Sequence, residues 1–568
     1  MILSRLISIL TGVAVSALAT KPGKVEFELQ IRNGVVSPDG FPRVGVLPND
    51  FPGPAIIANK GDQFNITVKN NLLDRTMTTD TTVHWHGLHV KKYIWADGAA
   101  FVSQCPIASG RAYTYTFDGG DQAGTFWYHS HLTSQYCDGL RGPLVIYDPK
   151  DPHLDLYDYD NATTIITLAD WYRTSYLTPL QDTRISQLRK TNLTALIRAL
   201  VFFSRRVIRF FSRLSRTSES TLINGIGRYK DGPQIPLAVV NVVQGKRYRF
   251  RFISMSCDPY YNVTIDGHEL TIIEVEGQRY SAVLHANNQV GNYWIRANPS
   301  EGPQGFKGGI NSAVLRYLSA PEEEPAPSEP EMPKMMLREW DLHPLKEAKV
   351  PGEPHLDGAD MNINLDFTTD PSTKLFLTNG HAYIPPVIPV LLQILRILNG
   401  PPSDLVKLLP KETIYYVPLN KTIQLSMPIR KKKELSGTPH PMHLHGHNFT
   451  VIRSAGNDSF QWNNPIQRDV VDTGYSGDNV VIRWTTDNPG PWFFHCHIDD
   501  HLGRCLCLYT LKRALLTKSS RGMAIIFVPE DLRSIEEDNT PAPDEWKRLC
   551  PDYGDQWLGN EQDNMMTD

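Results

Sequence analysis

Short runs of alternating or continuous apolar residues, each bounded by Gly, Pro or Asp, recur along most of the chain. Successive side chains of an extended strand point to opposite faces, so a run with a period of two buries one face of a sheet. Many short strands separated by turn residues are typical of β-sandwiches and β-barrels. The pattern therefore predicts an all-β protein. Its first-quarter runs are Val25–Ile31, Gln63–Val68, Thr82–His86, Ala112–Phe117, Gly124–His129 and Leu144–Tyr147.

Turn-rich and proline-rich stretches divide this pattern into three parts. A chain of 568 residues is too long for one hydrophobic core. The strand Leu144–Tyr147 leads into a linker, a second β-rich block runs from Thr163 to Tyr317, and Ala320–Pro333 is rich in Pro and Glu. We therefore predict a signal peptide at residues 1–19 and domains at 20–150, 151–320 and 334–568.

The N-terminus predicts export. Arg5 precedes the apolar run Leu6–Val15, and Ala17-Leu18-Ala19 has the small residues of a cleavage site. The apolar run is too short to span a bilayer, so we expect a secreted protein without a membrane anchor. Sequons that fit export lie at Asn65, Asn161, Asn262, Asn420, Asn448 and Asn457.

Charge gives no reason to expect a nucleic-acid partner, because the net charge is -4 and the pI is about 6.5. One stretch departs from this balance. Residues 184–216 contain nine Lys or Arg and no Asp or Glu. Taken alone, this stretch predicts a basic amphipathic helix of the kind that binds membrane surfaces.

Four His-x-His pairs are the main chemical signal. They are His84/His86, His129/His131, His443/His445 and His495/His497. Random placement of 18 histidines in 568 residues would give about 0.6 such pairs. On a strand, each pair directs two imidazoles to one face. Eight convergent imidazoles exceed what one ion needs, so the sequence predicts a multinuclear metal centre built from both ends of the chain.

Cys496 indicates which metal this is. One thiolate with two imidazoles and a weak axial position is the blue-copper arrangement. Cys496 and His501 can supply two of these ligands and His440 the third. His495 and His497 point to the opposite face of the strand, so Cys496 gives electrons a short covalent route to the second centre.

At these motifs the chain resembles the fungal laccases of the multicopper oxidase family. The resemblance runs from about Val25 to the C-terminus, apart from the stretches that depart from it, and implies three cupredoxin-like Greek-key β-barrel or sandwich domains. The matching segments are His84-Trp85-His86-Gly87, Trp127-Tyr128-His129-Ser130-His131, His440-Pro441-Met442-His443-Leu444-His445-Gly446-His447 and His495-Cys496-His497-Ile498-Asp499-Asp500-His501-Leu502.

The resemblance also implies four copper ions and their ligands. The type 1 ion would be bound by His440, Cys496 and His501, and the type 2 ion by His84 and His443. The type 3 pair would be bound by two trios, which are His86, His129, His497 and His131, His445, His495. His447 is left over, and we interpret it as structural. The family pattern further implies the disulfides Cys105–Cys550 and Cys137–Cys257.

The implied reaction is one-electron oxidation of phenolic aromatic substrates coupled to the four-electron reduction of O₂ to water. Asp97 and Asp499 match acidic residues near the family's copper cluster, and Asp258 matches the carboxylate that accepts a phenol proton. Each of the three could instead be a turn carboxylate that accepts backbone N–H groups. We expect small phenols and O₂ as partners, and a monomer.

The chain departs from the family pattern in three places. Residues 184–216 and 504–520 look like insertions, and Glu276-Gly277-Gln278 lacks a hairpin's worth of residues. Retained or lost exon sequence is the simplest explanation of all three. With residues 504–520 removed, Met523 takes the axial type 1 position, whereas Leu506 takes it if they stay. We expect such an insertion to move the axial residue and to sever the following strand from its sheet.

Two alternatives to a laccase stay open from the sequence. A multicopper ferroxidase would need acidic residues beside the type 1 histidines, and the sequence does not locate them. An inactive copper-binding glycoprotein would result if the insertions disrupt the site.

Overall fold

The computed structural model describes residues 23–175, 217–330, 337–370, 376–398, 412–429, 439–499, 501 and 522–565, with side chains described up to residue 554. The predicted signal peptide and the stretches 184–216 and 504–520, including Leu506, lie outside the described residues. Strands account for most of the regular structure, and each of the six runs predicted in the first quarter contains or lies within a strand.

The first unit is a sandwich of two four-stranded sheets, in the orders β2-β1-β4-β6 and β3-β8-β7-β5. Alternation explains the packing, since every second residue of β4 faces inward and Phe64, Ile66 and Val68 are completely buried. The strands are β1 (Lys24–Val36), β2 (Arg43–Pro48), β3 (Ile56–Asn59), β4 (Gln63–Asn71), β5 (Val83–His86), β6 (Ala112–Asp118), β7 (Gly124–Ser130) and β8 (Arg141–Tyr147).

The second unit contains a six-stranded sheet, β11-β10-β9-β13-β16-β15, and a four-stranded sheet, β12-β18-β17-β14. Its buried core includes Phe250, Ile295 and Leu315. The strands are β9 (Ile165–Trp171), β10 (Ser220–Ile223), β11 (Ile226–Tyr229), β12 (Val239–Val242), β13 (Arg247–Ser254), β14 (Tyr261–Ile265), β15 (Leu270–Val275), β16 (Arg279–His285), β17 (Asn292–Pro299) and β18 (Ser312–Tyr317).

The third unit contains two five-stranded sheets, β19-β23-β28-β25-β26 and β22-β30-β29-β24-β27, and the small pair β20-β21. The strands are β19 (Met361–Asn364), β20 (Phe367–Thr369), β21 (Phe376–Thr378), β22 (Ile414–Val417), β23 (Thr422–Pro428), β24 (Pro441–Leu444), β25 (Phe449–Arg453), β26 (Gln467–Arg468), β27 (Val470–Asp472), β28 (Asn479–Thr485), β29 (Trp492–Cys496) and β30 (Ala524–Pro529).

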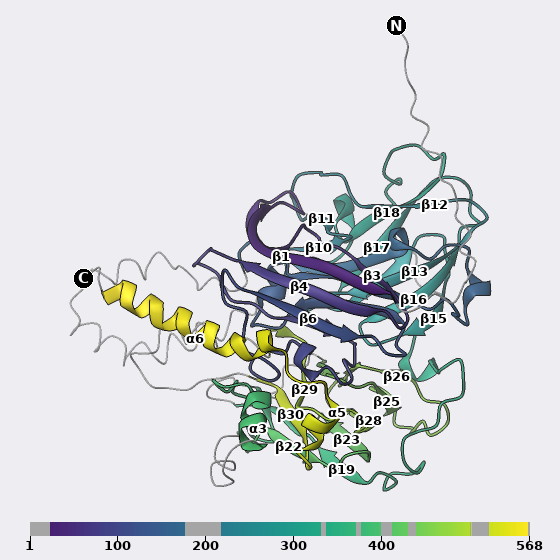
Figure 1. Cartoon of the computed structure of the whole chain (residues 1–568). Coiled ribbons are helices and arrows are strands. Elements are labelled where there is room, and N and C mark those ends of the chain that lie inside the picture. Colours follow the sequence, from purple (N-terminus) through teal and green to yellow (C-terminus); the bar gives the residue numbers. More distant parts are fainter. Residues whose placement is uncertain are drawn as a thin grey trace.

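The α-helices that the structure describes beside these sheets are α3 (Val390–Leu398), α5 (Ser534–Asp538) and α6 (Asp544–Met565). Helix α6 begins against the first unit (Figure 1). The Trp546 indole donates to the Ser103 carbonyl at 3.0 Å, and Cys550 forms a disulfide with Cys105. Val390 and Ile526 share one buried cluster with first-unit residues such as Phe64. The first and third units therefore pack into a common core.

One expectation about the C-terminal departure is wrong. Strand β30, which follows residues 504–520, is not severed from its sheet, because it pairs antiparallel with β29 from Trp492↔Phe527 to His495↔Ala524. The N–H of Met523 also donates to the carbonyl of His501 at 3.3 Å. Met523, which directly precedes β30, thus lies next to His501, the last described residue before the insertion.

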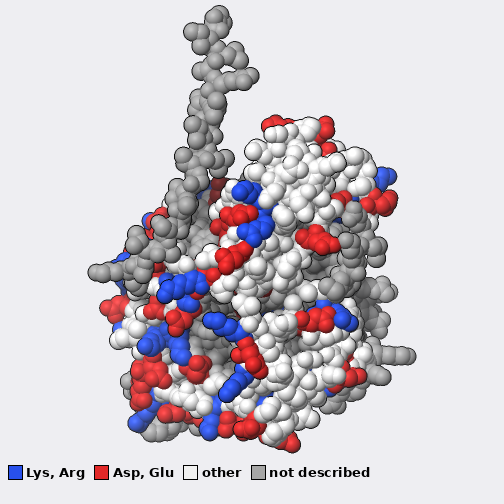
Figure 2. All heavy atoms as spheres, turned by 90° about the vertical axis from the view of Figure 1, so that its right-hand side faces the viewer, with Lys and Arg blue, Asp and Glu red and all other residues white. Residues whose placement is uncertain are grey.

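Within the described residues, no helix is long and apolar enough to cross a membrane. The face seen in Figure 2 carries acidic and basic side chains interspersed with each other rather than a patch of one sign.

Candidate metal centre

Two pairs of neighbouring strands contain or directly precede the eight histidines of the four His-x-His pairs. Strands β5 and β7 pair antiparallel in the first unit, so that His84 lies opposite His129. Strands β24 and β29 pair antiparallel in the third unit, so that His443 lies opposite His495. Because these two units share a core, the histidines from both ends of the chain meet between them.

All eight histidines of the four pairs belong to one ring cluster. The Nε2 atoms of His445 and His495 lie 3.2 Å apart, and those of His131 and His495 lie 3.4 Å apart. His84 and His443 approach through Nε2 atoms at 3.4 Å. His497 completes the cluster, with its ring centroid 4.9 Å from that of His86 and 5.1 Å from that of His129.

Backbone carbonyls hold the outer nitrogens of several of these rings. Nδ1 lies 2.6 Å from the Asp97 carbonyl in His84, 2.9 Å from the Asp469 carbonyl in His443 and 3.0 Å from the Cys496 carbonyl in His495. A neutral imidazole that donates through Nδ1 has a free lone pair on Nε2. This is the arrangement in which outer hydrogen bonds orient metal-ligating histidines.

Burial favours the neutral form of several of these rings. It lowers the pKa of His131 and of His497 to about 3, with a further lowering by neighbouring histidines. Burial and the other rings also lower the pKa of His86 and His443 well below 6.5. Neutral imidazole is the form that binds metal ions, so the cluster is prepared for ligation across the neutral pH range.

Asp97 lies against this cluster and is 1% exposed. Its carboxylate oxygens are 3.0 and 3.2 Å from Nδ1 of His445, and Oδ1 is 3.4 Å from Nδ1 of His84. These contacts are to imidazoles rather than to turn amides. Asp97 can therefore orient two histidines.

A second site surrounds Cys496, which is buried and forms no disulfide with any cysteine in the described ranges. Its Sγ lies 3.3 Å from Nδ1 of His501 and 3.7 Å from Nδ1 of His440, and the two nitrogens are 3.0 Å apart. Burial raises the pKa of the Cys496 thiol, and the charges of Asp258 and Asp472 raise it further. A thiolate at this position therefore needs a bound cation to stabilise it.

Met523 and Phe376 border this second site. Met523 is completely buried in the same apolar cluster as Cys496, and its carbonyl accepts the Cys496 N–H at 3.0 Å. The ring of Phe376 packs on that of His501 with centroids 4.0 Å apart. The alternative axial residue, Leu506, lies outside the described residues.

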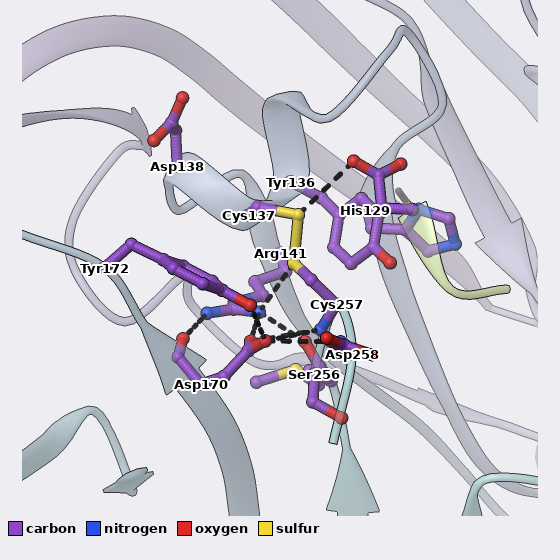
Figure 3. The surroundings of a disulfide bond; sticks show 12 residues. His129, Tyr136, Cys137, Asp138, Arg141, Asp170, Tyr172, Ser256, Cys257 and Asp258 are labelled. Atoms are coloured by element: carbon purple, nitrogen blue, oxygen red, sulfur yellow. Dashed lines mark hydrogen bonds and ion pairs between the residues drawn. A yellow bond between two sulfur atoms is a disulfide. The ribbon is translucent and has the colours of Figure 1, made fainter. Parts of the chain in front are cut away.

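Asp258 lies on a loop held by the Cys137–Cys257 disulfide and by Asp170 (Figure 3). Asp170 accepts the N–H groups of Cys257 and Asp258, at 3.0 and 3.2 Å. Arg141 in turn donates to Asp170 at 3.1 Å and to the Met255 carbonyl. This buried network fixes the backbone of the loop that carries Asp258.

Asp499 lines a cavity of about 70 Å³ that also reaches His129, His131, His495 and His497. Its side chain is buried, and Oδ2 lies 3.4 Å from Sγ of Cys137. The Asp499 N–H donates to the Cys257 carbonyl at 3.1 Å, which links this loop to that of Asp258. The cavity gives a small molecule or water a place beside the imidazole cluster.

Sequence reasoning missed the ion pair between Arg279 and Asp469. The two groups make bidentate contacts of 2.7 and 2.6 Å and are almost completely buried. Asp469 Oδ1 also lies 3.5 Å from Nε2 of His86. Arg141 and Asp170 were missed too. These partners are far apart in sequence and have no characteristic spacing, so no local signal could have found them.

The donor sets fit copper. A thiolate and two imidazoles around one point are typical of blue-copper sites, and clustered imidazoles suit copper among the transition metals. Among the described residues, five groups of three potential ligands have ligand atoms within 4.8 Å of one another; they are His440/Cys496/His501, His131/His445/His495, His84/His443/His445, His84/His86/His129 and His86/His443/Asp469.

This fold and these two centres define a multicopper oxidase. Sequence models described as multicopper oxidase match residues 30–151, 162–278 with 275–320, and 383–513. The chain belongs to the multicopper oxidase family. The middle match falls into two pieces that meet at residues 275–278, where the sequence predicts that residues are missing.

Within that family the chain groups with the fungal laccases. It is 47% identical to Laccase-4 of Trametes villosa over 93% of both chains. It is 45% identical to a laccase of Trametes hirsuta, covering 97% of this chain and 98% of the relative, and 44% identical to a laccase of Phlebia radiata, covering 96% of each. These relatives favour the laccase prediction over the ferroxidase alternative.

Solved structures agree on the fold. The laccase from Botrytis aclada is 26% identical, with a TM-score of 0.70 and coverage of 95% of this chain and 93% of that one. Fet3p, a multicopper oxidase that functions in iron import, is 22% identical, with a TM-score of 0.73 and coverage of 94% and 95%. The latter likeness concerns the fold alone. The prediction of cupredoxin-like domains is confirmed.

Proposed function

We propose that this chain is a secreted, monomeric enzyme that oxidises phenolic aromatic substrates by one electron each and reduces O₂ to water. The observation that carries the proposal is the continuity of the segment His495-Cys496-His497. Its central residue belongs to the thiolate site, while its two neighbours belong to the imidazole cluster. Two centres joined by one strand suit an enzyme that takes electrons at one site and uses them at the other.

The ligands divide as the family pattern implies. His440, Cys496 and His501 would hold the type 1 ion, with Met523 as the fourth residue of that site, and His84 and His443 would hold the type 2 ion. The type 3 pair would be held by two trios, which are His86, His129, His497 and His131, His445, His495. Bound copper supplies reversible one-electron chemistry at the thiolate site and O₂ reduction at the cluster.

Carboxylates of the protein accept and hold the protons of this reaction. Four phenols lose four electrons and four protons, and one O₂ takes both to give two waters. The Asp258 carboxylate accepts the phenol proton at the substrate side. Asp499 borders the cavity beside the cluster and holds a proton for the oxygen side, while Asp97 holds Nδ1 of His445 and keeps its Nε2 directed inward.

The test compares the copper-loaded wild type with Cys496→Ser and with His447→Asn, a matched variant of the histidine in the segment His440–His447 that is not in the ligand set. We expect the wild type to show intense blue thiolate-to-copper absorbance and hydroquinone-dependent O₂ uptake. Cys496→Ser should lose both, because a hydroxyl cannot replace the soft thiolate, while His447→Asn should retain the blue absorbance.

Blue absorbance that persists in Cys496→Ser would refute the ligand assignment. A colourless wild type without O₂ uptake would instead support the inactive copper-binding glycoprotein.

A further inference from the structure

A polar cavity of about 250 Å³ lies at the junction of the first and third units. Lys91 forms an ion pair across this junction, with its Nζ 3.0 Å from Oδ2 of Asp487. The Asn488 side chain donates through Nδ2 to the carbonyls of His89 and Gly446, at 2.9 Å each. All five of these residues line the cavity, so its walls come from both units and are held together by these contacts.

Two buried side chains of the cavity wall contain unpaired hydrogen-bond acceptors. His447 is 6% exposed and Asn488 is 4% exposed. Nδ1 of His447 lies 3.3 Å from the carbonyl of His445, to which it can only donate, so Nε2 carries the lone pair. This Nε2 and Oδ1 of Asn488 have no hydrogen-bond partner among the described residues. Because buried polar atoms are normally paired, the wall suits an occupant with hydroxyl or amide donors.

Asn448 provides a covalent attachment point beside this cavity. It begins the sequon Asn448-Phe449-Thr450, and both Asn448 and Thr450 line the cavity. Asn448 is exposed, as are Gln467 and Thr485 in the same wall, so the cavity opens to solvent at these residues. Phe449 begins strand β25 and is buried in the core of the third unit. A sugar linked to Asn448 therefore starts at the mouth of the cavity.

We propose that Asn448 carries an N-linked glycan whose first N-acetylglucosamine occupies this cavity and joins the first and third units. The inference rests on the secretion that the proposed function includes. During secretion a bond forms between Asn448 Nδ2 and C1 of an oligosaccharide that is linked to a lipid pyrophosphate. The lipid pyrophosphate leaves, and the amide nitrogen releases one proton.

The chemistry of the sugar matches that of the wall. Its hydroxyl and acetamide N–H groups can donate to Nε2 of His447 and to Oδ1 of Asn488, and its hydroxyl oxygens can accept from the ammonium group of Lys91. The first sugar thereby contacts residues of both units.

Two other occupants suit the cavity less well. Two imidazoles could bind a metal ion, but His89 and His447 belong to none of the ligand groups among the described residues whose ligand atoms lie within 4.8 Å of one another. An anion would need a free cation in the wall. Lys91 is already paired with Asp487, and Arg483 donates its N–H groups to neutral oxygens.

The experiment follows the glycans of the copper-loaded full chain secreted from a yeast host. Peptide mass spectrometry measures the occupancy of Asn448 and of the sequons at Asn262 and Asn457, neither of which lines the cavity. It is repeated after the native protein is incubated with an endoglycosidase that cuts between the first two sugars. Asn448→Gln removes the glycan, Asn457→Gln is its matched control in the same unit, and Gln467→Ala keeps the sequon but removes an amide from the cavity wall.

We expect Asn448 to be modified, and its glycan to be cleaved about tenfold more slowly than the glycans of Asn262 and Asn457, because cleavage has to wait for local opening of the junction. Gln467→Ala should reduce this protection by about threefold, as expected for one lost hydrogen bond. Asn448→Gln should lower Tm by about 2 °C and Asn457→Gln by less than about 1 °C.

An unmodified Asn448 in a chain whose Asn262 or Asn457 is modified would overturn the proposal. Cleavage of the Asn448 glycan at the same rate as the others in the native protein would also overturn it, because the sugar would then lie in solvent. A chain with no modified sequon would overturn the predicted secretion together with this inference.

Discussion

At the scale of the residue, Asp258 has an environment that suits a proton acceptor. Its backbone N–H is held by Asp170, so the loop keeps its shape through main-chain contacts. The charge of its carboxylate raises the pKa of the Cys496 thiol. A carboxylate on a fixed loop beside the electron-accepting site can take the proton of a phenol as the electron leaves.

Asp258→Asn therefore separates proton acceptance from electron acceptance. We expect kcat/KM for hydroquinone to fall by about 10²-fold, because general-base catalysis typically contributes 10²–10⁴-fold. A substrate that loses only an electron, such as ferrocyanide, should be oxidised within about twofold of the wild-type rate. Equal losses on both substrates would make Asp258 a structural residue.

The residues that the sequence could identify are those with local spacing. Each His-x-His pair spans three consecutive residues in or at the end of a strand. The side-chain period of two in a strand, together with the ligand chemistry of histidine, was therefore enough to identify it. Asp170 and Arg141 reach the site only through tertiary contacts. Nothing in the amino acids next to them in the sequence marks that role.

At the scale of the element, the hairpin between β15 and β16 docks against the strand that carries His129. Its turn residue Glu276 accepts the N–H of Thr125 in β7 at 2.7 Å. Burial, together with the nearby charge of Glu274, raises the pKa of Glu276 to about 8 from 4.5. The folded protein therefore keeps this carboxyl protonated at pH values where the unfolded chain has lost the proton.

This raised pKa fixes the sign of a pH effect. The stabilising contribution is complete below pH 4.5 and is lost as the pH rises through about 8. We expect the free energy of unfolding of the wild type to fall by about 3.5 kcal/mol between pH 5 and 8 relative to Glu276→Gln. Urea titrations measure it, with the exposed Glu322→Gln as control. Parallel pH profiles for wild type and Glu276→Gln would contradict it.

The contacts made just before strand β30 indicate how residues 504–520 affect the type 1 site. Met523 already donates to His501 and accepts from Cys496 while the insertion is present. We therefore expect deletion of 504–520 to leave copper content and hydroquinone activity within about twofold of the full chain. A severalfold rise in either quantity would show that the insertion displaces the axial residue after all.

Some elements escaped sequence reasoning for physical reasons. The alternating strands were predictable because half-buried sheets leave a period of two. Helix α6 has no apolar periodicity from which it could be predicted, since it contains Pro551 and few apolar residues. Its attachment includes the Trp546 indole and the Cys550 disulfide, contacts that a periodicity does not reveal.

At the scale of the whole molecule, the ion pair of Arg279 and Asp469 ties the second unit to the third beside the imidazole cluster. Breaking a buried pair leaves an uncompensated charge. We expect Arg279→Ala to lower the free energy of unfolding by about 3 kcal/mol and to reduce copper content, because Asp469 holds His443.

The matched control is Arg338→Ala, which removes an exposed ion pair with Asp341 and should change stability by less than about 0.5 kcal/mol. Denaturation curves and metal analysis give both quantities. Equal stability of the two variants would show that the inter-unit pair is not needed to join the units.

In the proposed function, two centres built from both ends of the chain act together as one four-electron oxidase. The ratio of hydroquinone-derived electrons to O₂ consumed by the copper-loaded protein, with peroxide assayed in parallel, tests this cooperation. We expect four electrons per O₂ and no peroxide. A ratio of two, with hydrogen peroxide as the product, would contradict it.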